Sequence, residues 1–399
     1  MVNKLPANWK LKTLSEVGNI ILGGTPDTTK KEYWNGNILW VIPSEVTSLP
    51  SKYLYDTERK ITELGLKNSS AKIIKPNSLI ICTRATIGNC CINKNEVATN
   101  QGFKSIIPNE DYDVVFLYYL IINNKQKLIS KASGTTFLEI SKTNLANLSF
   151  YFPPLDEQKR IASALSKIDA YLENTIKLIE EKERFKRGIA KKLLTCKEGE
   201  NIPEARFKGF EDEWEIVKLK DMFDNFKEKN NEDKIILAST IDKGVIPNSL
   251  TERKIIRKKE SLSNYKLVKK GCFVISLMSF QSGFEYSDYE GIISPAYTVL
   301  KPKIEMAHYF YKYYFKSFKF IKDLRPYAEG IRHGKQIKFK ACKDILLPYP
   351  SIEEQEKIGG YLSLLDAEID NLKKQKELIK EMKRGAMQKL LSGEVRLLE

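Results

Sequence analysis

The chain has 399 residues, 42% hydrophobic and 29% charged, a composition typical of folded domains and not of disordered segments. Lys and Arg outnumber Asp and Glu by 66 to 51, so the formal net charge is +15. The length suits two or three domains, and the positive excess fits either a polyanionic partner such as nucleic acid or a solvated lysine-rich surface.

Several classes of protein are excluded by what the composition lacks. Six cysteines form no C-x-x-C pair and there are two histidines, which argues against a structural zinc site and favours free, mostly buried thiols. The start "MVNKLPANWKLKTL" has no signal-peptide core, and the most apolar run, "VVFLYYLII", is too short to span a membrane. We expect a cytoplasmic protein with no membrane partner.

In chain order, the pattern predicts a globule, a long helix, a second globule and a second long helix. Residues 1–152 contain strand-like runs such as "NILWVI", "SLIICT" and "KSIIP", followed by the helical pattern "VVFLYYLIINNKQKLIS". Residues 153–198 form the first long helix and 350–399 the second. The Gly/Pro-containing linker "TCKEGENIPEARFKGF" begins at Thr195, and residues 199–349 hold most of it together with the strand-like runs "GCFVIS" and "AYTVLK".

The two halves of the chain repeat each other. Residues 152–194 align without gaps to residues 349–391 at an offset of 197, with 17 identities in 43 pairs. Upstream, "TERKI" occurs at Thr57 and again at Thr251, and Trp9 in "NWKLKTL" corresponds to Trp214 in "EWEIVKL". An internal duplication accounts for this match.

Both long helices carry a heptad seam. Apolar residues recur at steps of four and three, namely Ile161, Leu165, Ile168 and Leu172 in the first copy and Ile358, Leu362, Leu365 and Ile369 in the second. One such stripe could simply cover a domain core, whereas two in matching phase can bury each other. Gly188 and Gly385 fall at matched positions, where we expect either a closely approaching backbone or a break in the helix.

No catalytic constellation is present in the sequence. "FYFPPLDE" lacks the Asn or Asp that precedes the prolines of an adenine methyltransferase motif, and "GIRHGKQ" has neither the spacing nor the Ser/Thr of a P-loop. The E-x-K spacing at Glu58 and Glu252 lacks a convincing acidic partner, and His308 and His333 have no metal-ligand companions. Any chemistry is therefore expected to belong to a partner.

Several loops suit recognition of DNA bases instead. Arg suits guanine edges, and Asn and Gln suit adenine, although each residue alone could be an ordinary turn or cap. The candidate DNA-binding residues are Thr25, Lys30, Lys31, Thr83, Arg84, Thr86, Asn100, Gln101, Thr135 and Thr136 in the first globule and Ser279, Gln281, Ser282, Arg332, His333 and Lys335 in the second.

With these residues in view, the chain resembles the specificity subunit of a type I restriction-modification enzyme over essentially its whole length. The markers are "FPPLDEQKRIASALSKID" and "YPSIEEQEKIGGYLSLLD", each followed by a lysine-rich helix ending in "KRG…KLL". The first globule adds "LGGTP…EYWNGNILWV" and "TRATIG", and the second adds "SFQSG…ISPAYTVLKP" and "EGIRHGKQI". The loop "TRATIG" departs from the "SRGATIG" of many relatives. Because this loop is expected to vary, the difference does not argue against the family, and the DNA sequence recognised is not given by the protein sequence.

The resemblance implies an α+β protein in which two α/β target-recognition domains are separated by two long helices that form an antiparallel coiled coil, a pseudo-twofold repeat. Each globule would read one half of a bipartite double-stranded DNA site, and the helices would set the spacing and dock two methyltransferase subunits. Restriction subunits would join for cleavage. The chain itself would be non-catalytic and bind no cofactor or metal, with S-adenosylmethionine, ATP and Mg on the partner subunits.

Two other functions stay open from the residues alone. The chain could be a single-chain nuclease or methyltransferase with an unrecognised site, against which the missing motifs argue. It could also be a coiled-coil scaffold that binds only proteins, against which the net charge of +15 argues.

Overall fold

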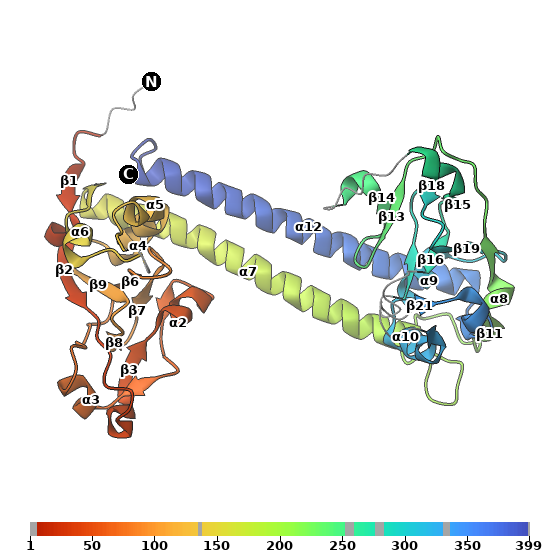
Figure 1. The fold of residues 1–399 in the computed structure, drawn as a ribbon, viewed down its shortest axis with the longest axis horizontal. Coiled ribbons are helices and arrows are strands. Elements are labelled where there is room, and N and C mark those ends of the chain that lie inside the picture. Colours follow the sequence, from red (N-terminus) through yellow and green to blue (C-terminus); the bar gives the residue numbers. More distant parts are fainter. Residues whose placement is uncertain (1–5, 135–137, 252–258, 276–282, 330–335, 398–399) are drawn as a thin grey trace. The chain divides into compact units, whose positions relative to one another are not determined.

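The computed structural model describes residues 6–134, 138–251, 259–275, 283–329 and 336–397. The chain divides into two compact units (Figure 1): unit 1 is Met1–Thr175 with Gln375–Glu399, and unit 2 is Ile176–Lys374. Each unit therefore contains one globule together with parts of both long helices. Within each unit, residues of the long helices share a core with the globule.

Unit 1 is built on a five-stranded sheet of order β2-β9-β6-β7-β4, beside a three-stranded sheet of order β5-β3-β8 and the pair β1-β10. The strands of unit 1 are β1 Lys10–Thr13, β2 Gly18–Leu22, β3 Trp34–Val41, β4 Tyr53–Leu54, β5 Lys60–Ile61, β6 Leu79–Cys82, β7 Cys90–Asn93, β8 Val97–Thr99, β9 Phe103–Pro108 and β10 Ser149–Phe152. Its shorter helices are α1 Leu14–Val17, η1 Lys31–Tyr33, α2 Pro43–Ser48, α3 Glu63–Lys67, α4 Val114–Asn123, α5 Lys125–Ile129 and α6 Lys142–Ala146.

The central strand β6 has a continuous apolar sequence because both faces of its sheet are covered. Leu79 and Ile81 lie in the core cluster that contains α4, whereas Ile80 and Cys82 lie in a second cluster on the opposite face. Successive side chains of a strand point to opposite faces, so a strand buried on both sides cannot alternate with polar residues.

Unit 2 repeats this framework with fewer long strands. Its main sheet has the order β12-β19-β16-β17, and its pairs are β11-β22, β13-β14, β15-β18 and β20-β21. The strands are β11 Glu215–Lys218, β12 Phe223–Phe226, β13 Leu237–Thr240, β14 Gly244–Pro247, β15 Lys266–Val268, β16 Phe273–Ile275, β17 Phe284–Tyr286, β18 Gly291–Ile293, β19 Thr298–Pro302, β20 Ala328–Glu329, β21 Gln336–Ile337 and β22 Leu346–Tyr349. The shorter helices are α8 Leu219–Met222, η2 Asn248–Leu250, η3 Lys259–Asn264, α9 His308–Tyr314, α10 Phe318–Leu324, η5 Arg325–Tyr327 and α11 Phe339–Cys342.

The sheet orders confirm the predicted internal repeat. β2-β9-β6-β7 in unit 1 corresponds strand for strand to β12-β19-β16-β17 in unit 2. In each unit, one strand near the start of the globule pairs antiparallel with the strand that leads into a long helix, β1 with β10 and β11 with β22. The predicted α+β class is confirmed as well.

The two long helices are α7, Leu155–Leu194, and α12, Ile352–Leu391. They run antiparallel within each unit. In unit 1, Lys383 of α12 pairs with Asp169 of α7 at 2.5 Å, and in unit 2, Lys182 of α7 pairs with Glu368 of α12 at 2.6 Å. Among the helices that the structure describes, none is both long enough and apolar enough to cross a membrane.

The seam residues are buried, but their neighbours differ from those expected. Ile161 and Leu165 are fully buried in the core of unit 1, with Met387, Leu390 and Leu391 from the end of α12. In unit 2, Ile358, Leu362 and Leu365 are buried and share a core with the end of α7. Ile369 is buried as well, whereas Ile168 and Leu172 of unit 1 are half-buried. Because the helices run antiparallel, each seam meets its own globule and the last turns of the other helix, and not the other seam.

The matched glycines lie inside unbroken helices, and no other element of this chain approaches them. α7 continues through Gly188 and α12 through Gly385, so the helices do not break there. A Cβ added at either position would meet no atom of another element within 4 Å. Both positions therefore leave bare helix backbone open to the surroundings.

Each long helix begins with a buried glutamate that an arginine holds in the same way. Glu157, at the start of α7, accepts two hydrogen bonds from Arg396 at 2.5 and 2.6 Å. Glu354, at the start of α12, accepts two from Arg206 at 2.8 and 2.7 Å. In both cases the arginine lies beyond the end of the other long helix, so the pair ties the two helices together within one unit.

A second repeated contact ties the globule to both helices. In unit 1, Asp169 accepts a hydrogen bond from Tyr119 of α4 at 2.6 Å, in addition to its ion pair with Lys383. In unit 2, Asp366 accepts one from Tyr313 of α9 at 2.7 Å and pairs with Lys186. The aspartates and lysines are separated by the repeat offset of 197, so the duplication preserved this contact.

Candidate nucleic-acid interface

The loop between β6 and β7 places Arg84 at the surface of unit 1. Thr83 directly follows β6, is fully buried, and donates from its hydroxyl to the Gly102 carbonyl at 3.1 Å. Ala85 and Gly88 have φ of 59° and 82°, conformations that turn the chain sharply back. The buried anchor and the turn hold the intervening Arg84 side chain out of the core.

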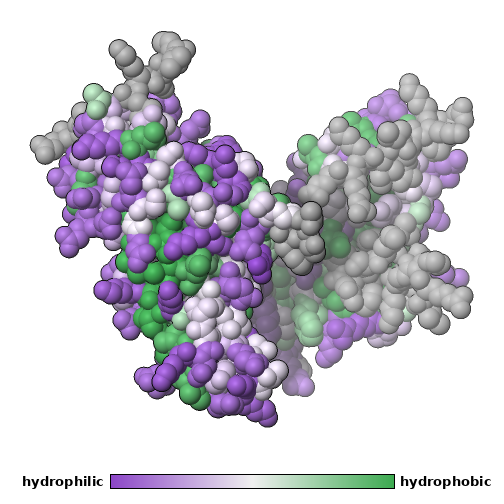
Figure 2. Space-filling view, turned by 60° about the vertical axis from the view of Figure 1, so that its left-hand side comes forward, coloured by the Kyte–Doolittle hydropathy of each residue, from purple (hydrophilic) through white to green (hydrophobic). Residues whose placement is uncertain are grey.

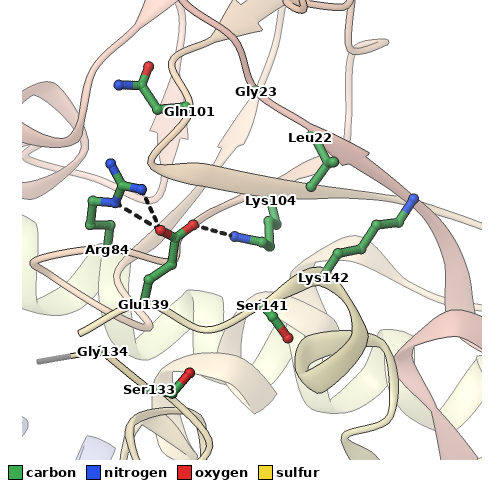
Figure 3. Close-up of a pocket in the computed structure, with 10 residues that line it drawn as sticks. All are labelled: Leu22, Gly23, Arg84, Gln101, Lys104, Ser133, Gly134, Glu139, Ser141 and Lys142. Atoms are coloured by element: carbon green, nitrogen blue, oxygen red, sulfur yellow. Dashed lines mark hydrogen bonds and ion pairs between the residues drawn. The ribbon is translucent and has the colours of Figure 1, made fainter. Parts of the chain in front are cut away.

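Glu139 is the centre of the charged network around Arg84 (Figure 3). Its carboxylate accepts from Arg84 Nε at 2.9 Å and Nη2 at 2.5 Å, and from Lys104 Nζ at 2.9 Å. Lys104, in β9, is 6% exposed and also donates to Thr83 at 3.1 Å, whereas the Arg84 side chain is 43% exposed. Although burial alone would raise the pKa of Glu139, the hydrogen bonds from Lys104 and Arg84 hold that pKa below its ordinary value.

These side chains line an open pocket with a volume of about 620 Å³. Figure 3 shows Glu139 between Arg84 and Lys104, with Lys142 on the same side of the pocket as Lys104. Three cations and one carboxylate therefore line the pocket, and the local excess of positive charge favours an anionic ligand. The lining residues are Leu22, Gly23, Arg84, Gln101, Lys104, Ser133, Gly134, Glu139, Ser141 and Lys142.

Close packing of two loops adds Gln101 to this pocket. A Cβ on Gly23 would lie 1.8 Å from the Asn100 carbonyl oxygen, so glycine is required for the loops to approach. The approach lets Thr25 donate a hydrogen bond to the Gln101 side chain. Gln101 itself is exposed, so a bound ligand can reach its side chain.

The structure thus brings together three of the predicted DNA-binding residues, Arg84, Gln101 and Thr25. The prediction that Thr83 contacts DNA is wrong, because its side chain is fully buried. Its hydroxyl instead accepts a hydrogen bond from Lys104 and positions that lysine. The Asn100 side chain is occupied in its own turn, where it accepts from the Gly102 amide at 2.9 Å.

The other predicted residues lie elsewhere. Lys30 and Lys31 are exposed at η1 and do not line the pocket, and the Thr86 hydroxyl oxygen is buried. Eight candidates lie outside the described residues, namely Thr135, Thr136, Ser279, Gln281, Ser282, Arg332, His333 and Lys335.

Sequence reasoning missed Lys104, Glu139 and Lys142. One feature of the sequence could have pointed to the first two: "FKSII" places a lysine in a strand whose neighbours are all apolar or small. A lysine buried in a sheet requires a carboxylate partner, and Glu139 is the acidic residue of the segment "FLEIS" that follows the "SGTTF" loop.

The surface of unit 1 also offers apolar contact. Figure 2 shows a band of hydrophobic residues between hydrophilic ones on the forward globule, which is unit 1. Leu22, at the edge of the pocket, is 43% exposed. Apolar side chains beside hydrogen-bonding ones suit the major groove, where thymine presents a methyl group. Within the described ranges, no group of three or more His, Cys, Asp or Glu could hold a metal ion.

Comparison with known proteins identifies the architecture. The family model described as "Type I restriction modification DNA specificity domain" matches residues 6–181 and again 211–381. The MjaVIII specificity subunit of Methanocaldococcus jannaschii is 24% identical over 99% of this chain and 94% of its own length. The MjaIX specificity subunit of the same organism is 35% identical over 46% of this chain, a stretch that spans 43% of that relative.

A solved structure shares the fold. The type I restriction-modification S subunit from M. genitalium has a TM-score of 0.56 with this chain at 17% sequence identity. The match covers 98% of this chain and 97% of that one.

Proposed function

Since this chain belongs to the type I restriction-modification DNA specificity family, we propose that it is the specificity subunit of such a complex and that each unit reads one half of a bipartite DNA site. The observation that carries the proposal is the repeated framework. The two units have the same strand order and the same Tyr-Asp-Lys and Glu-Arg contacts with the helices. The loops differ, as expected if the scaffold is shared and each globule has its own target.

In unit 1, the pocket around Arg84 is the base-reading site. An arginine that presents two donors to O6 and N7 of guanine makes the commonest specific contact in the major groove, and glutamine suits adenine. Glu139 holds the Arg84 guanidinium through Nε and Nη2, which fixes its direction before DNA arrives. Lys142 and other exposed lysines contact phosphates and set the register of the duplex.

The long helices connect the two readers and dock the partners. Two helices of 40 residues each give a stiff connection, so the separation of the half-sites is set by geometry. The bare backbone at Gly188 and Gly385 allows close approach by a helix from each of two methyltransferase subunits. Restriction subunits join this assembly for cleavage.

In this proposal the chain carries no active site. S-adenosylmethionine belongs to the methyltransferase subunits, which modify adenine, and ATP with Mg belongs to the restriction subunits. The site of action is the cytoplasm, where the chromosomal DNA lies.

A genome-wide map of adenine methylation in the host, with and without this gene, tests the proposal. We expect one split motif to lose methylation when the gene is deleted and to regain it when the gene is restored. Unchanged methylation in a host whose partner methyltransferase is expressed and co-purifies with this chain would refute the proposal.

A further inference from the structure

A second pocket, in unit 2, has an apolar floor and a strongly basic rim. It lies between the last turns of α7 and the α9–α10 region, and has a volume of about 560 Å³. Half-buried Ala190 and the exposed ring of Phe318, 71% of whose surface is accessible, provide its apolar surface, over the buried Leu194 and Tyr313. An aromatic ring left this exposed beside an apolar hollow is typical of a contact surface.

Six cations line this basic pocket: Lys186, Arg187, Lys191, Lys316, Lys319 and Lys322. Three have acidic partners, because Lys186 pairs with Asp366, Lys316 with Glu285, and Lys319 with Asp323.

The other three cations carry the excess charge. Arg187, Lys191 and Lys322 are exposed and make no ion pair or side-chain hydrogen bond with the part of the chain that the structure describes. Three uncompensated positive charges therefore surround an apolar surface.

The corresponding place in unit 1 has a different character. Leu391 and Ser392 there match Leu194 and Thr195 at the repeat offset of 197, and they also line a pocket. That pocket, however, contains one cation, Lys127. The shared framework accounts for the hollow in both units, but it does not account for the charge in unit 2.

We propose that the basic pocket binds an acidic segment of a partner protein, with an apolar side chain of that segment seated on the floor, and that one such segment binds per chain. An acidic peptide satisfies the three exposed cations, and its apolar side chain packs against Ala190 and Phe318. A DNA backbone would satisfy the cations alone and leave the apolar floor in water. This site goes beyond the DNA-reading function and does not depend on it.

The test uses the full chain and two fluorescent peptides of Asp and Glu, one with a central Phe and one with Ala in its place. Fluorescence anisotropy at physiological salt measures affinity and stoichiometry. The variant R187E/K191E/K322E reverses the three exposed charges, and F318S removes the exposed ring. A matched control, K131E/K167E/R384E, reverses three exposed cations of unit 1, including Arg384, which corresponds to Arg187.

We expect the Phe peptide to bind one per chain and to bind more tightly than the Ala peptide. Charge reversal in unit 2 should weaken it by about tenfold or more, because rim charges act together on an acidic ligand, and F318S should weaken it too. The control should bind as the wild type does. Equal loss in the control, no preference for Phe, or two peptides per chain would overturn the proposal.

A short duplex DNA of unrelated sequence serves as the competing probe. If charge reversal in unit 2 abolished duplex binding and left peptide binding unchanged, the patch would be a phosphate contact and the proposal would be wrong. Methylation of the split motif is measured separately, so loss of peptide binding with normal methylation would leave the DNA-reading function in place.

Discussion

Replacing Arg206 with Ala should destabilise unit 2 by about 3 kcal/mol. The Glu354 side chain is 1% exposed and accepts hydrogen bonds from Arg206 at 2.8 and 2.7 Å and from Trp214 at 2.9 Å. Removing one partner of a buried pair costs about 3–5 kcal/mol, because the remaining charge is left in the core. Arg206 is 13% exposed and Trp214 still donates, so we expect the lower end of that range.

Calorimetry or circular dichroism of the full chain measures this effect. For a unit of this size, about 3 kcal/mol corresponds to a fall in melting temperature of about 6–12 °C. In a Glu354→Gln background the same substitution should cost about 1 kcal/mol, because no buried charge is left behind. Arg184→Ala, an exposed arginine on α7, is the control and should change stability by no more than about 0.5 kcal/mol. An R206A loss that matched this control, or that was undiminished by E354Q, would show that Arg206 does not stabilise a buried charge on Glu354.

Three further perturbations test other parts of the account. Arg84→Ala should weaken binding at one half-site by about 1–3 kcal/mol and relax its specificity, measured by competition between DNA variants; an equal loss on every sequence would make Arg84 a phosphate contact. Deleting one heptad from a long helix should change the preferred spacer and neither half-site sequence, and an unchanged spacer would contradict the role given to the helices. Burial opposes the charge of Asp169, yet hydrogen bonds from Lys383 and Tyr119 hold its pKa below the ordinary value. The Asp169 carboxylate therefore stabilises the fold above about pH 4, and this stabilisation is lost as the pH falls through the folded-state pKa. The loss of stability that Asp169→Asn shows in urea unfolding at pH 7 should accordingly vanish in strong acid. A loss of stability that stayed constant with pH would show that packing, not charge, is responsible.

The two long helices were predictable from the sequence, because each is indicated by a short local pattern and the pattern occurs twice. Pro154 and the acidic residues after it mark the start of α7, and the heptad seam indicates which face of the helix is buried. The match between the two copies then located α12, whose start at Ile352 lies two residues after the predicted boundary. The seam's neighbours were not predictable, since they depend on how each helix meets its globule.

The site was less accessible from the sequence because it joins distant residues. Arg84 and Gln101 could be found as single polar residues in glycine-containing loops. Their environment could not, because Glu139 lies 55 residues after Arg84 and 35 after Lys104. Thr83 shows the limit of residue type as evidence, since a threonine beside a candidate arginine turned out to be a buried support.

The most direct test of the central claim, that each unit reads its own half of the site, is a methylation map made with a chimaera. Residues 1–152 are replaced by the corresponding globule of a relative that methylates a different split motif, and both helices are kept. We expect one half of the motif to change to that of the relative, while the other half and the spacer stay as in the wild type. A methylated motif changed in both halves, or in neither, would contradict it.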